Sequence, residues 1–132
     1  MERKRVEVVA AILIHNHKVF IAQRGYGTFQ SFYELPGGKC EQGETREEAL
    51  EREIREELDT EISVDEFVTT IEYDYPDFHL VMHCYRCSIQ KGQLTLLEHT
   101  DAKWVGKEEL ADVNWLPADV QLIEPLGKLL DR

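Results

Sequence analysis

The chain has 132 residues, of which 26 are acidic and 15 are basic, so its formal net charge is −11. This length suits one domain rather than two, and we expect residues 1–132 to form a single domain. With 42% hydrophobic residues the chain can build a core, which excludes an intrinsically disordered protein. The negative charge disfavours a nucleic acid polymer as partner. The longest apolar run, residues 8–14, is far below the roughly 20 residues of a membrane span.

The first half of the chain begins with a predicted hairpin. Residues 6–14 are apolar and β-rich, which predicts a strand, and residues 18–23 predict a second strand after a turn at 15–17. Residues 24–31 contain two glycines and are expected to form a loop, and the segment Leu35-Pro36-Gly37-Gly38 marks a further turn.

A helix is predicted after this turn. Thr45 and Glu48 fit a capping box, in which each side chain accepts a hydrogen bond from the backbone amide of the other residue. An apolar stripe at helical spacing follows, made of Ala49, Leu50, Ile54 and Leu58. We expect the helix to end at residues 59–60.

The second half of the chain predicts more strands and a C-terminal helix. Strand-like segments cover 67–73, 80–89 and 102–105, a short helix is expected over 107–110, and residues 117–130 are apolar enough for a docked helix. Pro125 should kink or restart that last helix. Strands on both sides of a strong helix predict an α/β domain with a mixed sheet.

Three glutamates of the predicted helix are the most informative residues. Glu53, Glu56 and Glu57 are spaced i, i+3 and i+4, which places them on one helix face, where like charges repel one another. A divalent cation would neutralise them, and their hard oxygen ligands favour Mg²⁺ or Mn²⁺ together with substrate phosphates. The alternative is an ordinary solvated acidic face. The preceding Gly37-Gly38 turn favours the metal, because it lets backbone carbonyls approach an ion.

The same segment resembles the Nudix box, G-x5-E-x7-R-E-U-x-E-E-x-G-U, where U is a bulky aliphatic residue. Seven positions match: Gly38, Glu44, Arg52, Glu53, Ile54, Glu56 and Glu57. Asp59 stands where the box has glycine and Thr60 where it has an aliphatic residue. Both departures concern the end of the helix rather than its acidic face. The resemblance implies the Nudix fold, an α/β/α sandwich around a mixed β-sheet.

Residues 5–130 resemble the MutT branch of this family, the nucleoside triphosphate pyrophosphohydrolases. The supporting segments are 23–24, 33–39, 75–80 and 116–119, together with Glu98 placed six residues before Trp104. The segment 116–119 is most similar to bacterial enzymes that hydrolyse CTP and 5-substituted cytosine nucleotides. The resemblance implies hydrolysis of a nucleoside triphosphate to the monophosphate and pyrophosphate with Mg²⁺, or Mn²⁺, by a monomer or homodimer.

Three alternatives to this activity stay open at this point. The first is an 8-oxo-dGTP diphosphatase of the MutT type. The second is a Nudix hydrolase that acts on another nucleoside diphosphate derivative, and the third is a regulator that binds nucleotides without cleaving them.

The resemblance also implies roles for individual residues. The metal ions would be held by the Gly37 carbonyl and by Glu53, Glu56, Glu57 and Glu98, and Glu98 could instead assist the attacking water. Arg52 would orient Glu44 or Glu53. Arg24 and Lys39 would contact phosphate oxygens, and the base pocket would be lined by Glu34, Phe78 and Asp119.

Several of these residues also have plain structural interpretations. Arg24 could be a surface charge, Lys39 could offset the acidic helix, and Phe78 could be ordinary core. Asp119 could be a helix N-cap. In a pocket, ionised Asp119 would favour the amino group of cytosine, whereas a protonated Asp119 could donate to a carbonyl such as that of 8-oxoguanine.

The three cysteines are Cys40, Cys84 and Cys87, an odd number that indicates reduced thiols and a cytoplasmic protein. Cys84 and Cys87 have the spacing of half a zinc site. On a strand, however, residues three apart point to opposite faces, so we expect no zinc.

Overall fold

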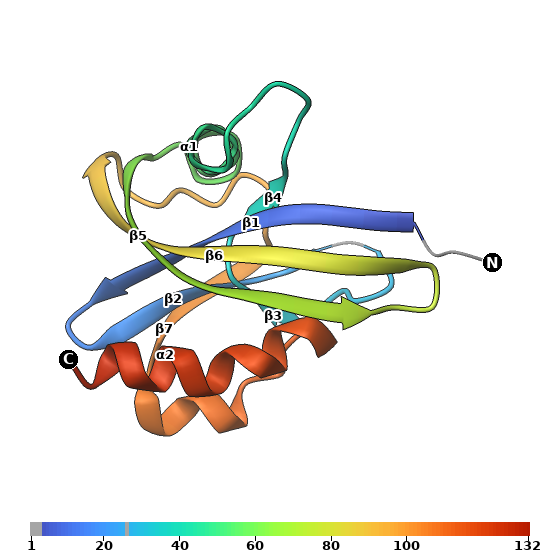
Figure 1. The fold of residues 1–132 in the computed structure, drawn as a ribbon. Helices are drawn as coiled ribbons and strands as arrows, with labels where there is room; N and C mark the ends of the chain where they lie inside the picture. The colour runs from blue at the N-terminus through green and yellow to red at the C-terminus, as the bar shows by residue number, and fades with distance from the viewer. Residues whose placement is uncertain (1–3, 26) are drawn as a thin grey trace.

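The computed structural model describes residues 4–25 and 27–132, and the strands of this part form a seven-stranded mixed sheet. The elements in chain order are β1 (Lys4–His15), β2 (Lys18–Gln23), β3 (Tyr33–Glu34), β4 (Gly37–Lys39), α1 (Arg46–Leu58), β5 (Glu61–Asp74), β6 (Phe78–Lys91), β7 (Asp101–Gly106), 3-10 helices over Lys107–Asp112 and Pro117–Leu122, and α2 (Ile123–Leu130). Figure 1 shows α1 on one side of the sheet and α2 on the other, the expected α/β/α sandwich.

Strand β1 is the centre of the sheet. It pairs in parallel with β6 over ten residues, from Lys4 opposite Phe78 to Leu13 opposite Cys87. It also pairs antiparallel with β2 near the first hairpin, and with β4 from Val8 to Ala10. The sheet order is β3-β2-β1-β6-β5, with β7 added to β2. This arrangement brings β4, and therefore the glycine turn, to the middle of the molecule.

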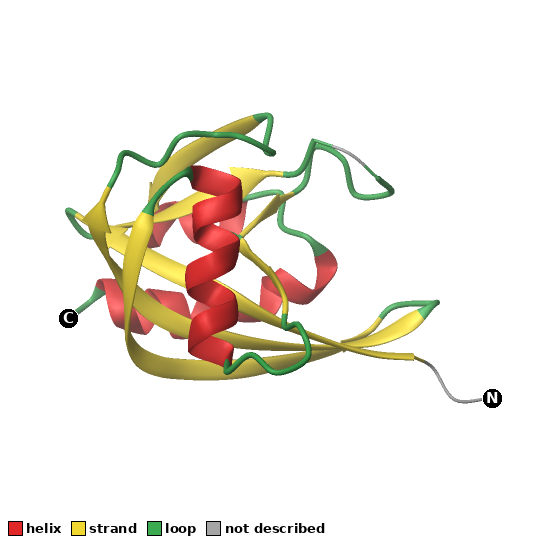
Figure 2. Ribbon diagram, turned by 90° about the horizontal axis from the view of Figure 1, so that it is seen from above, coloured by secondary structure: helices red, strands yellow, loops and turns green. Residues whose placement is uncertain are grey.

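The alternation of β1 divides the core into two layers. Val9 and Ala11 belong to the layer under α1, whereas Ala10 and Ile12 belong to the layer under α2. Figure 2, seen from above, shows α1 lying across the sheet.

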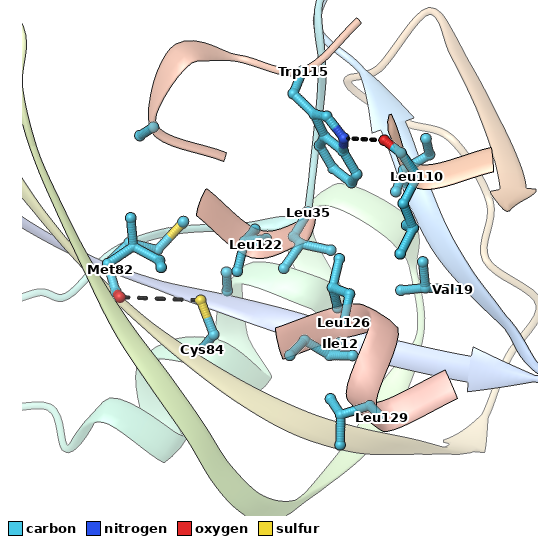
Figure 3. Close-up of a cluster of buried hydrophobic side chains, with 14 of the residues drawn as sticks. Ile12, Val19, Leu35, Met82, Cys84, Leu110, Trp115, Leu122, Leu126 and Leu129 are labelled. Carbon is cyan, nitrogen blue, oxygen red and sulfur yellow. Dashed lines mark hydrogen bonds between the residues drawn. The ribbon is translucent and has the colours of Figure 1, made fainter. Parts of the chain in front are cut away.

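The layer under α2 is drawn in Figure 3. Ile12 lies close to the C-terminal leucines Leu122, Leu126 and Leu129, and the Trp115 indole Nε1 donates a 2.9 Å hydrogen bond to the Leu110 carbonyl. A buried indole keeps its polar atom satisfied in this way.

The two cysteines of β6 lie in different layers, as their spacing predicts. Cys84 packs in the layer under α2 and Cys87 in the layer under α1. Burial raises the pKa of both thiols, to about 12 for Cys87. These two cysteines therefore cannot share a metal ion.

Helix α1 forms as its sequence predicts. The Thr45 hydroxyl accepts a hydrogen bond from the Glu48 backbone amide at 3.1 Å, and the Glu48 carboxylate accepts one from the Thr45 amide at 2.9 Å. The buried face contains Ala49, Leu50, Ile54 and Leu58, which pack on the sheet. The helix ends at Asp59, which adopts the left-handed conformation with φ 49°.

Several predicted boundaries differ from the structure, most clearly at β4 and β5. Residues 37–39 form strand β4 rather than only a turn, because β1 offers them backbone partners. Strand β5 begins at Glu61, before the predicted residue 67. The prediction missed its first residues because 65–66 are exposed and charged, as is common on an edge strand. The C-terminal segment is a 3-10 helix followed by α2, which restarts near Pro125 as expected. None of the helices in the described ranges has the length and apolar character of a membrane span.

The left-handed conformation at Asp59 predicts a stabilising substitution. Asp59→Gly should raise the free energy of unfolding by roughly 0.5–1 kcal/mol, because glycine adopts this conformation without a steric penalty. Asp59→Ala, which keeps the Cβ but lacks the polar group, is the control and should destabilise the protein. Urea unfolding measures both, and a less stable glycine variant would contradict the assignment.

Candidate active site

Glu57 is the most unusual side chain of the acidic helix face. The residue is only 7% exposed, its Oε2 has no hydrogen-bond partner in the described residues, and the Gly37 amide donates to the carboxylate. Burial raises the pKa of Glu57 to about 9, and three neighbouring carboxylates, Glu53, Glu34 and Glu98, add to the rise. Glu57 is therefore not part of an ordinary solvated acidic face.

Arg52 holds the remaining carboxylates of the cluster. Its guanidinium donates to Glu44 through Nε at 2.7 Å and Nη2 at 3.0 Å, to Glu53 at 2.9 Å and to Glu56 at 3.2 Å. The paired charges lower the pKa of Glu44 and raise the pKa of Arg52. The resemblance left open whether Arg52 orients Glu44 or Glu53, and in the structure Arg52 donates to both. It makes no contact that neutralises Glu57.

The cluster fits a hard divalent cation that also takes ligands from a substrate. In residues 4–25 and 27–132, no group of three or more His, Cys, Asp or Glu side chains is arranged so that it could hold a metal ion by itself. Glu57 nevertheless offers an unpartnered oxygen, and burial raises the pKa of Glu53 despite the opposing charge of Arg52. A Cβ at Gly38 would overlap the Glu53 carboxyl group, so a larger residue there would force this carboxylate to shift. Mg²⁺ commonly completes such a partial set with phosphate oxygens.

A cavity of about 400 Å³ opens beside this cluster. The predicted site residues on its wall are Arg24, Glu34, Gly37, Phe78 and Asp119. Gly37 and Gly38 belong both to the wall and to the surroundings of the carboxylates, so the cluster and the cavity are adjacent. The cavity is mostly apolar elsewhere, with walls that include Val8, Ala10, Leu80, Met82 and Leu116.

Lys39 and Glu98 lie outside the cavity wall. Lys39 is exposed at the end of β4, and its carbonyl accepts a 3.0 Å hydrogen bond from Arg52. Glu98 is exposed on the loop before β7, and its charge reaches Glu53 and Glu57. The structure thus brings Glu98 near the acidic cluster.

Asp119 lines the same cavity and is almost fully buried. It is 4% exposed, and its Oδ2 accepts a hydrogen bond from the Leu35 amide at 3.3 Å. Burial, followed by the charge of Glu34, raises the pKa of Asp119 to about 8. The N-cap interpretation is wrong, because Leu116 occupies the cap position of this 3-10 helix.

Aromatic rings that the sequence reasoning did not single out line the cavity beside Phe78. The Tyr75 ring stacks on Phe78 with centroids 5.0 Å apart, and Phe29 lies 5.5 Å from Tyr75. The Tyr75 hydroxyl accepts a hydrogen bond from the Ala118 amide at 3.1 Å, which ties the β5–β6 turn to the helix that carries Asp119. The run of aromatic and proline residues at 73–78 was the available signal.

His99 is a second residue that sequence reasoning missed. Its Nε2 lies 3.2 Å from Glu34 Oε2, while Arg24 donates to Glu34 Oε1 at 2.7 Å. The signal was its position next to Glu98, but the spacing of the histidines gave no metal pattern.

Comparisons with known proteins agree with this geometry. A family model described as the NUDIX domain matches residues 4–126. The chain is 35% identical to the CTP pyrophosphohydrolase of Escherichia coli (strain K12) over 122 residues, which cover 92% of this chain and 90% of that protein. It is also 35% identical to the 8-oxo-dGTP diphosphatase of Proteus vulgaris over 97 residues, 72% of this chain and 87% of that protein.

A solved structure shows the same relationship in three dimensions. The solution structure of the E. coli ORF135 protein matches with a TM-score of 0.83 and 34% identity, over 96% of this chain and 91% of that chain. The fold, the acidic helix and the matched family model lead to one conclusion: the chain belongs to the NUDIX domain family and is a Nudix hydrolase.

Proposed function

We propose that the chain hydrolyses a nucleoside triphosphate to the monophosphate and pyrophosphate with Mg²⁺, or Mn²⁺, and that cytosine nucleotides are preferred. The observation that carries this proposal is the buried Glu57 carboxylate, whose Oε2 has no hydrogen-bond partner in the described residues, beside a cavity that Asp119 also lines. One end of the site suits a cation that binds a phosphate chain, and the other end suits a base.

The acidic cluster would hold the cation through Glu53, Glu56, Glu57 and the Gly37 carbonyl, with Glu98 nearby. A divalent ion there would neutralise phosphate charge and activate water. Arg52 keeps Glu53 and Glu44 in place through hydrogen bonds to both. Arg24 would face the phosphates from the cavity wall, and Lys39 would act from the rim.

The base would lie against Phe78 and meet Asp119. The ionised carboxylate accepts a hydrogen bond and suits the amino group of cytosine, which agrees with the CTP pyrophosphohydrolase relative. With a pKa near 8, however, Asp119 is mostly protonated at neutral pH and can donate to a carbonyl. This observation favours 8-oxo-dGTP as the second candidate, the substrate named for the Proteus relative.

A substitution of Glu57 tests the catalytic assignment. Glu57→Gln should lower kcat by roughly 100-fold or more, because the amide removes the charge that attracts the cation. The fold should survive, since the neutral amide fits a site where the carboxyl pKa is already raised. Measurements are pyrophosphate release with and without EDTA, and calorimetry with Mg²⁺. Glu47→Gln, exposed on the same helix, is the matched control, and near-normal turnover of Glu57→Gln would contradict the assignment.

A panel of nucleotides tests the substrate. We expect kcat/KM for CTP, dCTP and 5-methyl-dCTP to exceed the values for dGTP and 8-oxo-dGTP. An 8-oxo-dGTP value more than about 100-fold above that of CTP would reverse the preference, since that ratio corresponds to about 2.7 kcal/mol of transition-state binding. Product analysis separates other Nudix reactions, because pyrophosphate is released only from a triphosphate.

The protonation of Asp119 predicts a pH dependence of stability. Its pKa rises from the ordinary 3.8 to about 8 in the folded state, so the folded protein holds a proton that the unfolded chain loses. The contribution of Asp119 is therefore fully present below about pH 4 and is lost as the pH rises towards 8. In urea unfolding, wild type should lose stability relative to Asp119→Asn between pH 5 and pH 9. A difference between the two proteins that does not change with pH would show that Asp119 titrates normally.

A further inference from the structure

His99 is a buried imidazole that contacts Glu34, a residue of the cavity wall. Its side chain is 7% exposed, and its Nε2 lies 3.2 Å from Glu34 Oε2. Its Nδ1 is buried with no hydrogen-bond partner in the described part of the chain. A nitrogen that faces a carboxylate oxygen carries the proton, so Nε2–H donates to Glu34. Among residues 4–25 and 27–132, the contact with Glu34 is the one side-chain hydrogen bond of this imidazole.

Glu34 acts on both parts of the proposed site. It lines the cavity, and its charge raises the pKa of Asp119 at one end and of Glu57 at the other. Its two oxygens have separate donors, because Arg24 Nη2 binds Oε1 at 2.7 Å and His99 binds Oε2. The orientation of the Glu34 carboxylate therefore depends on both donors.

We propose that His99 is a positioning residue for the nucleotide: its Nε2–H fixes the carboxylate of Glu34, an inference that rests on the function proposed above. Glu34 then keeps free acceptor sites directed at the nucleoside and holds Arg24 where a phosphate chain passes. A carboxylate held by two donors loses less conformational freedom when a ligand binds. His99 therefore acts on nucleotide binding rather than on the chemical step.

An alternative role for His99 would be to hold the loop that carries Glu98. The backbone hydrogen bonds of this loop argue against that role. His99 follows Glu98 and could serve to hold that residue near the acidic cluster. Three backbone hydrogen bonds already hold the loop, from Thr95 to the Leu58 carbonyl at 2.9 Å, from Leu97 to that of Glu57 at 3.0 Å, and from Thr100 to that of Gln23 at 3.2 Å. Loss of the imidazole should thus disturb Glu34 more than Glu98.

Two substitutions separate the hydrogen bond from the packing of the ring. His99→Leu fills the space without a donor, whereas His99→Gln places an amide N–H near the position of Nε2. We expect His99→Leu to raise KM for the preferred nucleotide roughly tenfold with kcat within about twofold, the loss typical of one hydrogen bond to a charged group. His99→Gln should restore most of the KM. The dissociation constant of a non-hydrolysable triphosphate, measured by calorimetry with Mg²⁺, should change in parallel with KM.

His15→Leu is the matched control, because His15 is exposed at the end of β1 and does not line the cavity. Melting temperatures verify that each variant is folded. A His99→Leu variant with the KM of wild type, or one whose loss lies only in kcat, overturns the proposal. So does failure of the folded His99→Gln variant to restore KM.

A measurement without substrate keeps this inference separate from the proposed function. Nitrogen-15 NMR of the imidazole should show the proton on Nε2, and Glu34→Gln should shift that resonance. If wild type cleaves no triphosphate, the proposed function fails, and the NMR result still decides whether His99 positions Glu34. A proton found on Nδ1 instead would overturn the positioning contact.

Discussion

The burial of one carboxylate among other carboxylates is the constraint on which the site depends. A buried charge without a partner is costly, and Glu57 is buried beside groups of the same sign. Arg52, a cationic side chain of the helix, is already bonded to Glu44, Glu53 and Glu56. The fold tolerates this arrangement because α1 is well capped and its apolar face is packed on the sheet.

At both Glu57 and Asp119, burial and neighbouring carboxylates disfavour the ionised form. Glu57 and Asp119 both have raised pKa values, and Glu34 contributes to both shifts from between them. A chain with a net charge of −11 has little means of attracting a polyanion unaided. In the function proposed above, its local excess of carboxylates would recruit a cation, and the charges that repel a phosphate chain would then become the means of binding it.

Patterns among residues close together in the sequence predicted the elements whose formation depends on those same residues. The capping box at Thr45 and the periodicity of α1 predicted that helix and its acidic face, and the structure confirms them. Contacts between residues far apart in the sequence produce no pattern along the chain from which they could be predicted. Asp119 meets the amide of Leu35, 84 residues away, and His99 meets Glu34 across 65 residues. The family resemblance placed Asp119 in the pocket, whereas no pattern along the chain identified His99.

The parallel pairing of β1 with β6 has a consequence for how the protein is made. Val9, Ala11 and their apolar neighbours leave the ribosome early, yet the strand that pairs with them is synthesised only after α1 and β5 are complete. Parallel ladders between distant segments form slowly, because a long loop must close first. The nascent chain therefore carries an apolar, strand-prone segment that lacks its parallel partner until β6 has been synthesised.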